Sequence, residues 1–194
     1  MKRNTKNMGQ KQREYIVTLV TTALLAAMFI VLDKFLIIPI GNSIRLSFGL
    51  VPLILSGVFF GPVFGGLTGA AGDIIGCIIS GMMPINPIIV AGNVIIGVIS
   101  GFFDPKWVCG GKYYRYFILS MASSLPSAAV IKTIGLYLYY RTPPITVVWR
   151  IISVFLLAVL SAPILKILTT RKEFLKFMPK RRENKIQGAG TTKV

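Results

Sequence analysis

The sequence contains no histidine, only two cysteines and only six acidic residues among 194. Without histidine, a His-based general base and a zinc site with a histidine ligand are both excluded. Cys77 and Cys109 lie far apart and form no metal-type spacing. No Walker-type phosphate-binding loop is present, so the chain does not hydrolyse ATP itself. We therefore expect neither an enzyme nor a bound cofactor.

Charged residues make up 14% of the chain, whereas hydrophobic residues make up 54% and the mean hydropathy is +0.70. A soluble domain usually has about a quarter charged residues. Long apolar stretches recur between residues 15 and 170, which leaves room for about six membrane spans and no soluble domain. The sequence therefore predicts an all-α membrane protein, a bundle of six transmembrane helices.

Hydropathy and helix-breaking residues set the limits of these spans. The expected spans are 15–38, 48–60, 62–81, 86–103, 113–140 and 144–170. The second and third are joined by Gly61 and Pro62, which is too tight for a real loop. Basic tails flank the bundle at 1–14 and 171–194, and we expect the second tail to be disordered.

The net charge of +16 would suggest a nucleic-acid partner in a soluble protein. Here, however, the basic residues flank the apolar spans, as the positive-inside rule expects on the cytoplasmic face. An even number of spans places both termini on that face. The sequence therefore predicts a multi-pass protein of a bacterial plasma membrane with both termini cytoplasmic, in contact with lipid and not with nucleic acid.

Glycines at four-residue spacing mark the second and third spans, at Gly57, Gly61, Gly65 and Gly69. In lipid, small residues at this spacing let helix backbones approach closely. We interpret most of these glycines as packing residues.

Charged side chains inside a bilayer are costly and usually face a cavity or a partner. Asp73, Lys132 and Arg150 lie well inside predicted spans, with Asn93 as a polar companion. In the predicted topology, all of them lie roughly 10–12 Å below the outer surface, on different helices. One interpretation is a buried ion pair that only fixes helix packing. The other is a cavity, open to the outside, for a solute with an anionic part and a hydrogen-bonding part.

In the cavity interpretation each charge has a role. The Asp73 carboxylate accepts two N–H bonds from a ring edge, and Lys132 and Arg150 hold a carboxylate of the solute. Arg45, in the outer link, guards the entrance. Phe48 is one of several aromatic residues near this layer that are candidates to stack on a flat ring.

The segments Arg45-Leu-Ser-Phe-Gly-Leu-Val-Pro52, Gly61-Pro62 and Gly69-Ala-Ala-Gly-Asp73-Ile-Ile-Gly76 resemble the S components of energy-coupling factor (ECF) vitamin transporters. Within that group, the chain is most similar to the folate-specific FolT branch. The resemblance implies an outward-facing vitamin pocket, in which Asp73 meets the pterin edge and the cations meet the glutamate tail.

The resemblance also implies partners. An AxxxA face on the first span, here Ala23 and Ala27, docks a transmembrane coupling subunit that binds two ATPase subunits. The resemblance further implies that the chain topples in the membrane during transport.

Other interpretations remain open from the sequence. Pantothenate, a queuosine precursor or a vitamin B6 form are alternative ligands for an S component. A secondary transporter of a small organic anion, a membrane enzyme and a structural scaffold are alternative classes.

Overall fold

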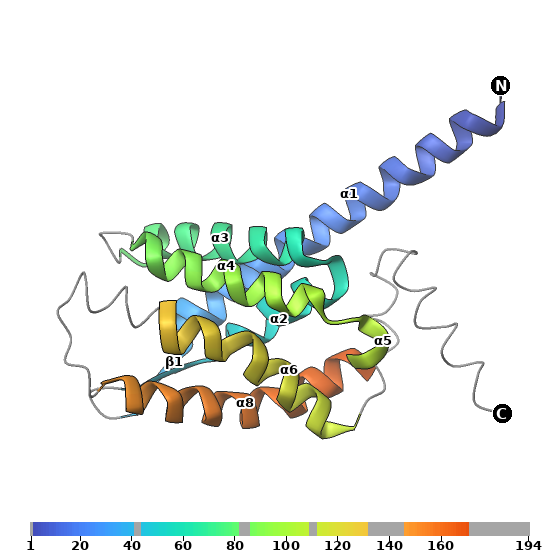
Figure 1. Cartoon of the computed structure of the whole chain (residues 1–194). Helices are drawn as coiled ribbons and strands as arrows, with labels where there is room; N and C mark the ends of the chain where they lie inside the picture. Colours follow the sequence, from blue (N-terminus) through green and yellow to red (C-terminus); the bar gives the residue numbers. More distant parts are fainter. Residues whose placement is uncertain (1, 41–43, 82–85, 109–111, 132–145, 171–194) are drawn as a thin grey trace.

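The protein is built mainly from helices, as its apolar segments predict (Figure 1). The structure, a computed structural model, describes residues 2–40, 44–81, 86–108, 112–131 and 146–170. The main helices in these ranges are α1 (Lys2–Ile30), α2 (Leu50–Phe60), α3 (Pro62–Ile79), α4 (Pro87–Phe102), α6 (Tyr113–Leu125) and α8 (Thr146–Thr170). Two π-helical turns, η1 (Val31–Phe35) and η2 (Pro126–Ile131), continue α1 and α6, and a short helix, α5 (Pro105–Val108), precedes α6. Each predicted span overlaps one of the main helices, although α1 begins at Lys2, well before the first predicted span.

A two-stranded antiparallel hairpin, β1 (Ile37–Ile40) and β2 (Ile44–Ser47), follows η1. The first predicted span reaches Ile38, whereas the helical part ends at Phe35, so the hairpin corrects a purely helical description. Isoleucine favours strands because its branched side chain packs well on a pleated surface. The register pairs Ile37 with Ser47, which returns Ser47 to the end of η1.

Local sequence explains where two of the helices begin. Gly61 is the single residue between α2 and α3 and has a φ of 102°, which glycine adopts at low cost. Pro62 then occupies the first turn of α3, where a missing N–H costs nothing. At the start of α4, the Asn86 side chain accepts a hydrogen bond of 3.0 Å from the Ile88 N–H. The tight link predicted at Gly61 and Pro62 is confirmed.

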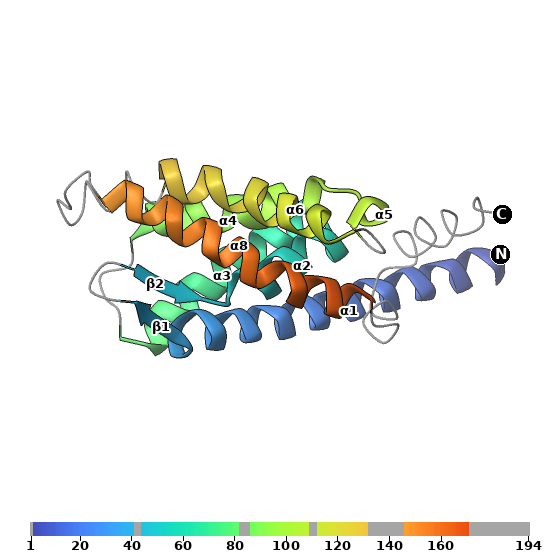
Figure 2. The same cartoon turned by 90° about the horizontal axis from the view of Figure 1, so that it is seen from below.

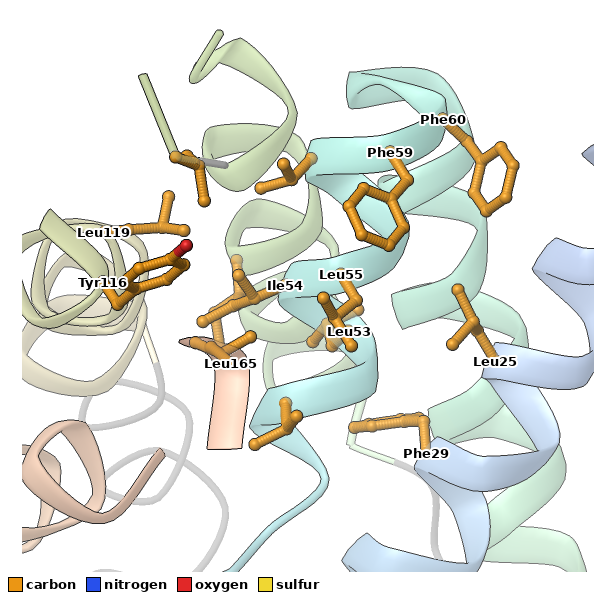
Figure 3. Close-up of a cluster of buried hydrophobic side chains, with 14 of the residues drawn as sticks. Leu25, Phe29, Leu53, Ile54, Leu55, Phe59, Phe60, Tyr116, Leu119 and Leu165 are labelled. Atoms are coloured by element: carbon orange, nitrogen blue, oxygen red, sulfur yellow. The ribbon is translucent and has the colours of Figure 1, made fainter. Parts of the chain in front are cut away.

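Helix α2 lies inside the bundle, and every residue from Val51 to Phe60 is buried. With 11 residues, α2 is only about 16 Å long, shorter than the bilayer core of about 30 Å. Its side chains pack with residues of α1, α6 and α8 in a common hydrophobic core (Figure 3). Leu25, Ile54, Leu119 and Leu165 are representative of that core.

The glycine pattern brings α2, α3 and α4 together at backbone distance. A Cβ atom added to Gly97 would collide with the Gly65 carbonyl oxygen, and one added to Gly57 would collide with the Ser100 hydroxyl. A Cβ on Gly69 would lie 2.6 Å from the backbone carbonyl oxygen of Asn93. The predicted packing role of these glycines is confirmed.

Hydroxyl groups hold α6 against α8. The Ser120 and Ser161 hydroxyls lie 2.9 Å apart, and Thr169 Oγ1 donates to the Tyr116 hydroxyl at 2.9 Å. All of these side chains are buried. In lipid, such interhelical hydrogen bonds replace the hydrophobic force that packs helices in water.

The outer surface of the bundle is apolar. Large exposed hydrophobic side chains lie along α1, α3 and α8, including Leu24, Leu67 and Phe155. Among the described residues, three segments are long and apolar enough to cross a membrane: Gln12–Phe35, Pro62–Ile79 and Ile151–Thr170. Helices α2 and α4 are apolar but shorter. The start of α1 and the end of α8 lie at one end of the bundle, and the hairpin lies at the other (Figures 1 and 2).

Candidate functional site

A cavity of about 90 Å³ lies between the helices and is bordered on one side by Ser47 of the hairpin. Its walls come from α1, η1, β2, α2, α4, α6 and α8. The residues that line it are Phe29, Asp33, Ser47, Leu50, Leu53, Asn93, Ile96, Ser124, Val154 and Leu157. Pockets for organic ligands usually measure roughly 300–1,000 Å³. The cavity therefore accommodates one edge of a ring, and a larger ligand must reach beyond these side chains.

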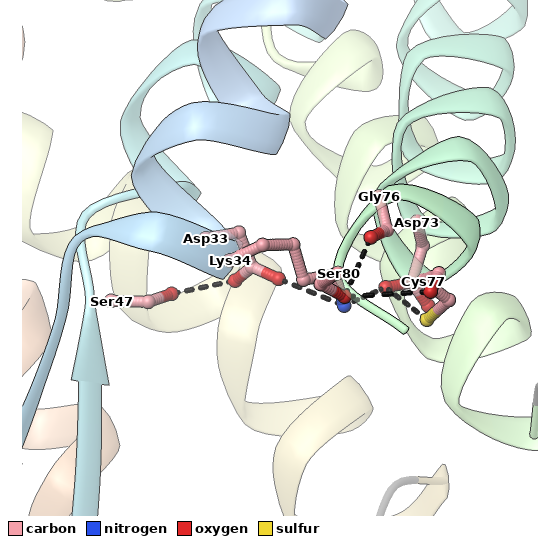
Figure 4. Close-up of polar contacts among 7 residues, drawn as sticks. All are labelled: Asp33, Lys34, Ser47, Asp73, Gly76, Cys77 and Ser80. Carbon is pink, nitrogen blue, oxygen red and sulfur yellow. Dashed lines mark hydrogen bonds and ion pairs between the residues drawn. The ribbon is translucent and has the colours of Figure 1, made fainter. Parts of the chain in front are cut away.

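The one charged group among these lining residues is the carboxylate of Asp33. Asp33 lies in η1, and its side chain is 24% exposed. Its Oδ1 accepts a hydrogen bond of 2.6 Å from the Ser47 hydroxyl, so the hairpin register holds the carboxylate in place (Figure 4). π-helical turns of this kind are rare and occur frequently at functional sites.

Lys34 links Asp33 to α3. Its ammonium Nζ lies 2.7 Å from Asp73 Oδ1 and 3.4 Å from Asp33 Oδ2 (Figure 4). The side chains of Lys34 and Asp73 are only 9% and 2% exposed. The Cys77 thiol lies 4.0 Å from the same Asp73 oxygen. Asp33, Lys34 and Asp73 form what we call the charge trio, with a formal charge of −1.

Glycines make room for the charge trio. A Cβ on Gly49 would lie 2.7 Å from Asp33 Cβ, and one on Gly76 would lie 3.0 Å from Lys34 Cε. Gly72 allows the Phe29 ring to pack directly against the backbone of α3. The end of α1 therefore fits closely between α3 and the start of α2.

Of the predicted polar layer, one described residue lines the cavity and another is buried in an ion pair. Asn93 is buried and lines the cavity. Asp73 is buried against Lys34 and is not one of the described residues that line the cavity. The buried ion pair considered in the sequence analysis exists, but its cation is Lys34. A direct ligand contact of Asp73 stays a prediction.

The other predicted ligand contacts are placed only in part. Arg45 lies in β2 opposite Pro39, and Phe48 is half-buried just before α2. Lys132 lies outside the described residues. Arg150 belongs to α8, but its side chain lies outside the described part of the structure. Their roles stay predictions.

The two alanines predicted as a docking face, Ala23 and Ala27, are both exposed on α1. They lie on the side of α1 away from the buried Leu25 and Phe29, so they are accessible to another helix.

Sequence reasoning missed Asp33 and Lys34, although both lie within the predicted first span. Charges near the end of an apolar run resemble the charges that ordinarily flank a membrane span, so these two residues were not recognised as buried. One signal was available, since the buried side of α1 carries Leu25 and Phe29 and the next position at that spacing is Asp33. A carboxylate that continues a buried stripe indicates a polar contact inside the bundle.

Comparison with known proteins gives a family and a fold. The family model of the "ECF-type riboflavin transporter, S component" matches residues 14–170. No curated protein matches the chain. A solved structure described as "Crystal structure of FolT bound with folic acid" superposes with a TM-score of 0.67 at 20% sequence identity, covering 80% of this chain and 95% of that chain.

The matched region contains all the described helices from α2 to α8 and most of α1. S components are substrate-binding membrane subunits of transporters and not enzymes, and they work with an ECF module. The sequence-based predictions of an S component, of a membrane location and of a chain that is not an enzyme are confirmed. Since the family model covers most of its length, the chain belongs to the ECF-type riboflavin transporter S-component family.

Proposed function

We propose that this chain is the high-affinity folate-binding subunit of an ECF transporter, with six membrane spans and both termini in the cytoplasm. The observation that supports this function best is the cavity between the helices, which combines apolar walls with the carboxylate of Asp33 and the polar side chains of Ser47 and Asn93. A few convergent polar groups in an apolar cavity are typical of small-molecule sites.

The ligand is proposed from chemistry together with the fold. A pterin ring is flat and mainly apolar on its faces, and it has hydrogen-bond donors along one edge, which suits a narrow cavity with a carboxylate. Folate carries its anionic glutamate tail at the other end, and we assign that tail to Lys132 and Arg150. Arg45 lies in the hairpin at the same end of the protein and is proposed to act at the entrance. The fold shared with FolT is consistent with this assignment.

The docking of the coupling subunit is proposed at Ala23 and Ala27. Alanines at four-residue spacing allow close approach of a second helix in lipid. Their exposure on α1 supports this role. Transport energy would then come from two ATPase subunits bound to the coupling subunit.

The proposed ligand is tested by purifying the chain from a complex medium and identifying the bound small molecule by mass spectrometry. We expect folate or a reduced folate. After the ligand has been removed, calorimetric titration with folate should give a dissociation constant in the nanomolar range. A purified chain that carries no folate and binds none in titration would refute the folate assignment.

Riboflavin is the second candidate, because the matching family model is that of a riboflavin transporter S component. The same experiment distinguishes the two ligands. Recovery of riboflavin from the purified chain, together with nanomolar binding of riboflavin and not of folate, would replace folate by riboflavin and leave the S-component class unchanged.

A further inference from the structure

We propose that Asp33 is the specificity-determining residue of the cavity and that its carboxylate selects a ring edge with two adjacent N–H donors. The inference rests on the proposed function, because it assigns one end of the vitamin to one side chain. It also assigns Lys34 and Ser47 as positioning residues that fix the orientation of the carboxylate.

The two carboxylates of the charge trio have different surroundings. Asp73 lies 2.7 Å from the Lys34 ammonium and its side chain is only 2% exposed. Asp33 lies 3.4 Å from the same ammonium, and its side chain is 24% exposed and lines the cavity. Lys34 is hydrogen-bonded to Asp73 and interacts with Asp33 only as a longer ion pair, so part of the net charge of −1 stays on the carboxylate that faces the ligand space.

The Asp33 carboxylate can accept more hydrogen bonds than its neighbours in the protein donate. An ionised carboxylate offers about four acceptor positions and no donor. Among the described residues, Ser47 donates to Oδ1 at 2.6 Å, and Lys34 approaches Oδ2 from the side of α3. The carboxylate therefore has acceptor capacity for N–H groups that enter from the cavity.

The two candidate rings present different hydrogen-bonding groups to a carboxylate. The pyrimidine edge of a pterin presents an exocyclic amino group beside a ring N–H, two donors that match the two oxygens of a carboxylate. The corresponding edge of a flavin presents one ring N–H between two carbonyl oxygens. A carboxylate facing that edge would place its negative charge against carbonyl oxygens. Asp33 therefore favours a pterin and disfavours a flavin.

A variant that neutralises Asp33 tests the inference, because loss of the local contact should weaken folate binding, whereas long-range electrostatics should strengthen it. Folate carries carboxylates, so removal of a negative charge from the protein should by itself strengthen folate binding. Loss of affinity on removal of the Asp33 charge would thus report a local contact with donor groups. A carboxylate that only holds the hairpin to η1 would not discriminate between ligands that differ at the ring edge.

The experiment measures dissociation constants of the purified full chain for folate, for a folate analogue without the 2-amino group, and for riboflavin. The variant is Asp33→Asn, which keeps the side-chain shape and can still accept the Ser47 hydrogen bond. The matched control is Asp104→Asn, which removes the same charge from an exposed residue in the link between α4 and α5. Size-exclusion chromatography and thermal unfolding establish that both variants are folded.

In the native chain, we expect the analogue to bind at least about 100-fold more weakly than folate, because the missing 2-amino group leaves one Asp33 oxygen without its N–H donor. Asp33→Asn should weaken folate binding by about 100-fold and bring folate and the analogue to within about 5-fold of each other. The ratio of riboflavin to folate affinity should rise in this variant. Asp104→Asn should bind all three ligands like the native chain.

A second variant keeps the inference testable if Asp33→Asn does not fold. Ser47→Ala removes only the group that orients Oδ1, and it should weaken folate binding by about 3- to 10-fold and the analogue by less. Suppose that the native chain binds folate. If a folded variant then weakens the binding of folate and of the analogue by the same factor, or weakens the binding of neither ligand, the inference is wrong and the folate function stands. If the native chain binds no folate, the proposed function itself fails.

Discussion

The Lys34 ammonium has two buried or half-buried carboxylates as neighbours, so its removal should destabilise the fold strongly. In the Lys34→Met variant the apolar part of the side chain remains, and only the charge is lost. Asp73 would then remain as an unpaired carboxylate with a side chain that is 2% exposed. We expect the free energy of unfolding to fall by about 3–5 kcal/mol, the range for breaking one partner of a buried ion pair.

The distances give the scale of this effect. At an effective dielectric constant of about 20, two unit charges 2.7 Å apart attract each other by about 6 kcal/mol, and charges 3.4 Å apart by about 5 kcal/mol. Desolvation of the ammonium and the carboxylates offsets much of this attraction, so the net stabilisation is small. The cost of the single variant comes mainly from the carboxylate that is left without a counter-charge.

A double-mutant cycle separates the coupling between Lys34 and Asp73 from the cost of leaving one of them without a partner. Asp73→Asn alone should also be destabilising, because it leaves Lys34 with the more distant Asp33 as its main partner. The double variant Lys34→Met/Asp73→Asn removes both charges and should be within about 2 kcal/mol of the native chain. The assay is denaturant unfolding of the purified chain in detergent, followed by circular dichroism. Lys112→Met, at the exposed start of α6, is the matched control and should change stability by less than about 0.5 kcal/mol.

Two results would refute this reasoning. Additive effects of the two single variants would mean that Lys34 and Asp73 are not coupled, and an unchanged stability of Lys34→Met would mean that Asp73 already has another counter-charge. The double variant also tests the site. If it binds folate within about 10-fold of the native chain, Asp73 acts as the partner of Lys34 and not as a direct ligand contact.

Two further predictions concern packing and docking. Gly97→Ala places a methyl group against the Gly65 carbonyl and should cost more than about 3 kcal/mol of stability. Gly66→Ala meets only the side chains of Val94 and Val98, at 3.5 and 3.1 Å, and should cost about 1 kcal/mol or less. Equal unfolding midpoints of the two variants would contradict the close approach of α3 and α4. Ala23→Leu and Ala27→Leu should leave folate affinity unchanged but abolish uptake by vesicles that contain the complete transporter. Normal uptake by both leucine variants would place the docking face elsewhere.

The helices and their close packing could be predicted because both depend on local patterns. Apolar runs give the helix positions to within a few residues, as for α3 and α4. Gly57, Gly65 and Gly69 lie at a spacing that is informative in lipid, where small residues are needed for close approach. The link at Gly61 and Pro62 follows from the conformational preferences of these two residues alone.

The site could be predicted only in part, because pairing between distant charges has no local pattern. The sequence shows that Asp73 needs a partner, but its depth points to Lys132 and Arg150, because Lys34 lies closer to the end of its predicted span. Only the fold places Lys34 beside Asp73. The hairpin was missed for a related reason, since its isoleucines continue the apolar run of the first span and its strands are recognisable only once they pair.

The first helix shows how one element combines several functions. On its buried side, Thr18, Thr22, Leu25 and Phe29 face the bundle, and η1 continues this side to Asp33 at the cavity. The wider π turn places the next residue, Lys34, against Gly76 and Asp73 of α3. The exposed side carries the proposed docking alanines. Adjacent side chains of this turn point in different directions, so the Asp33 carboxylate faces the ligand space while the neighbouring Lys34 ammonium pairs with Asp73.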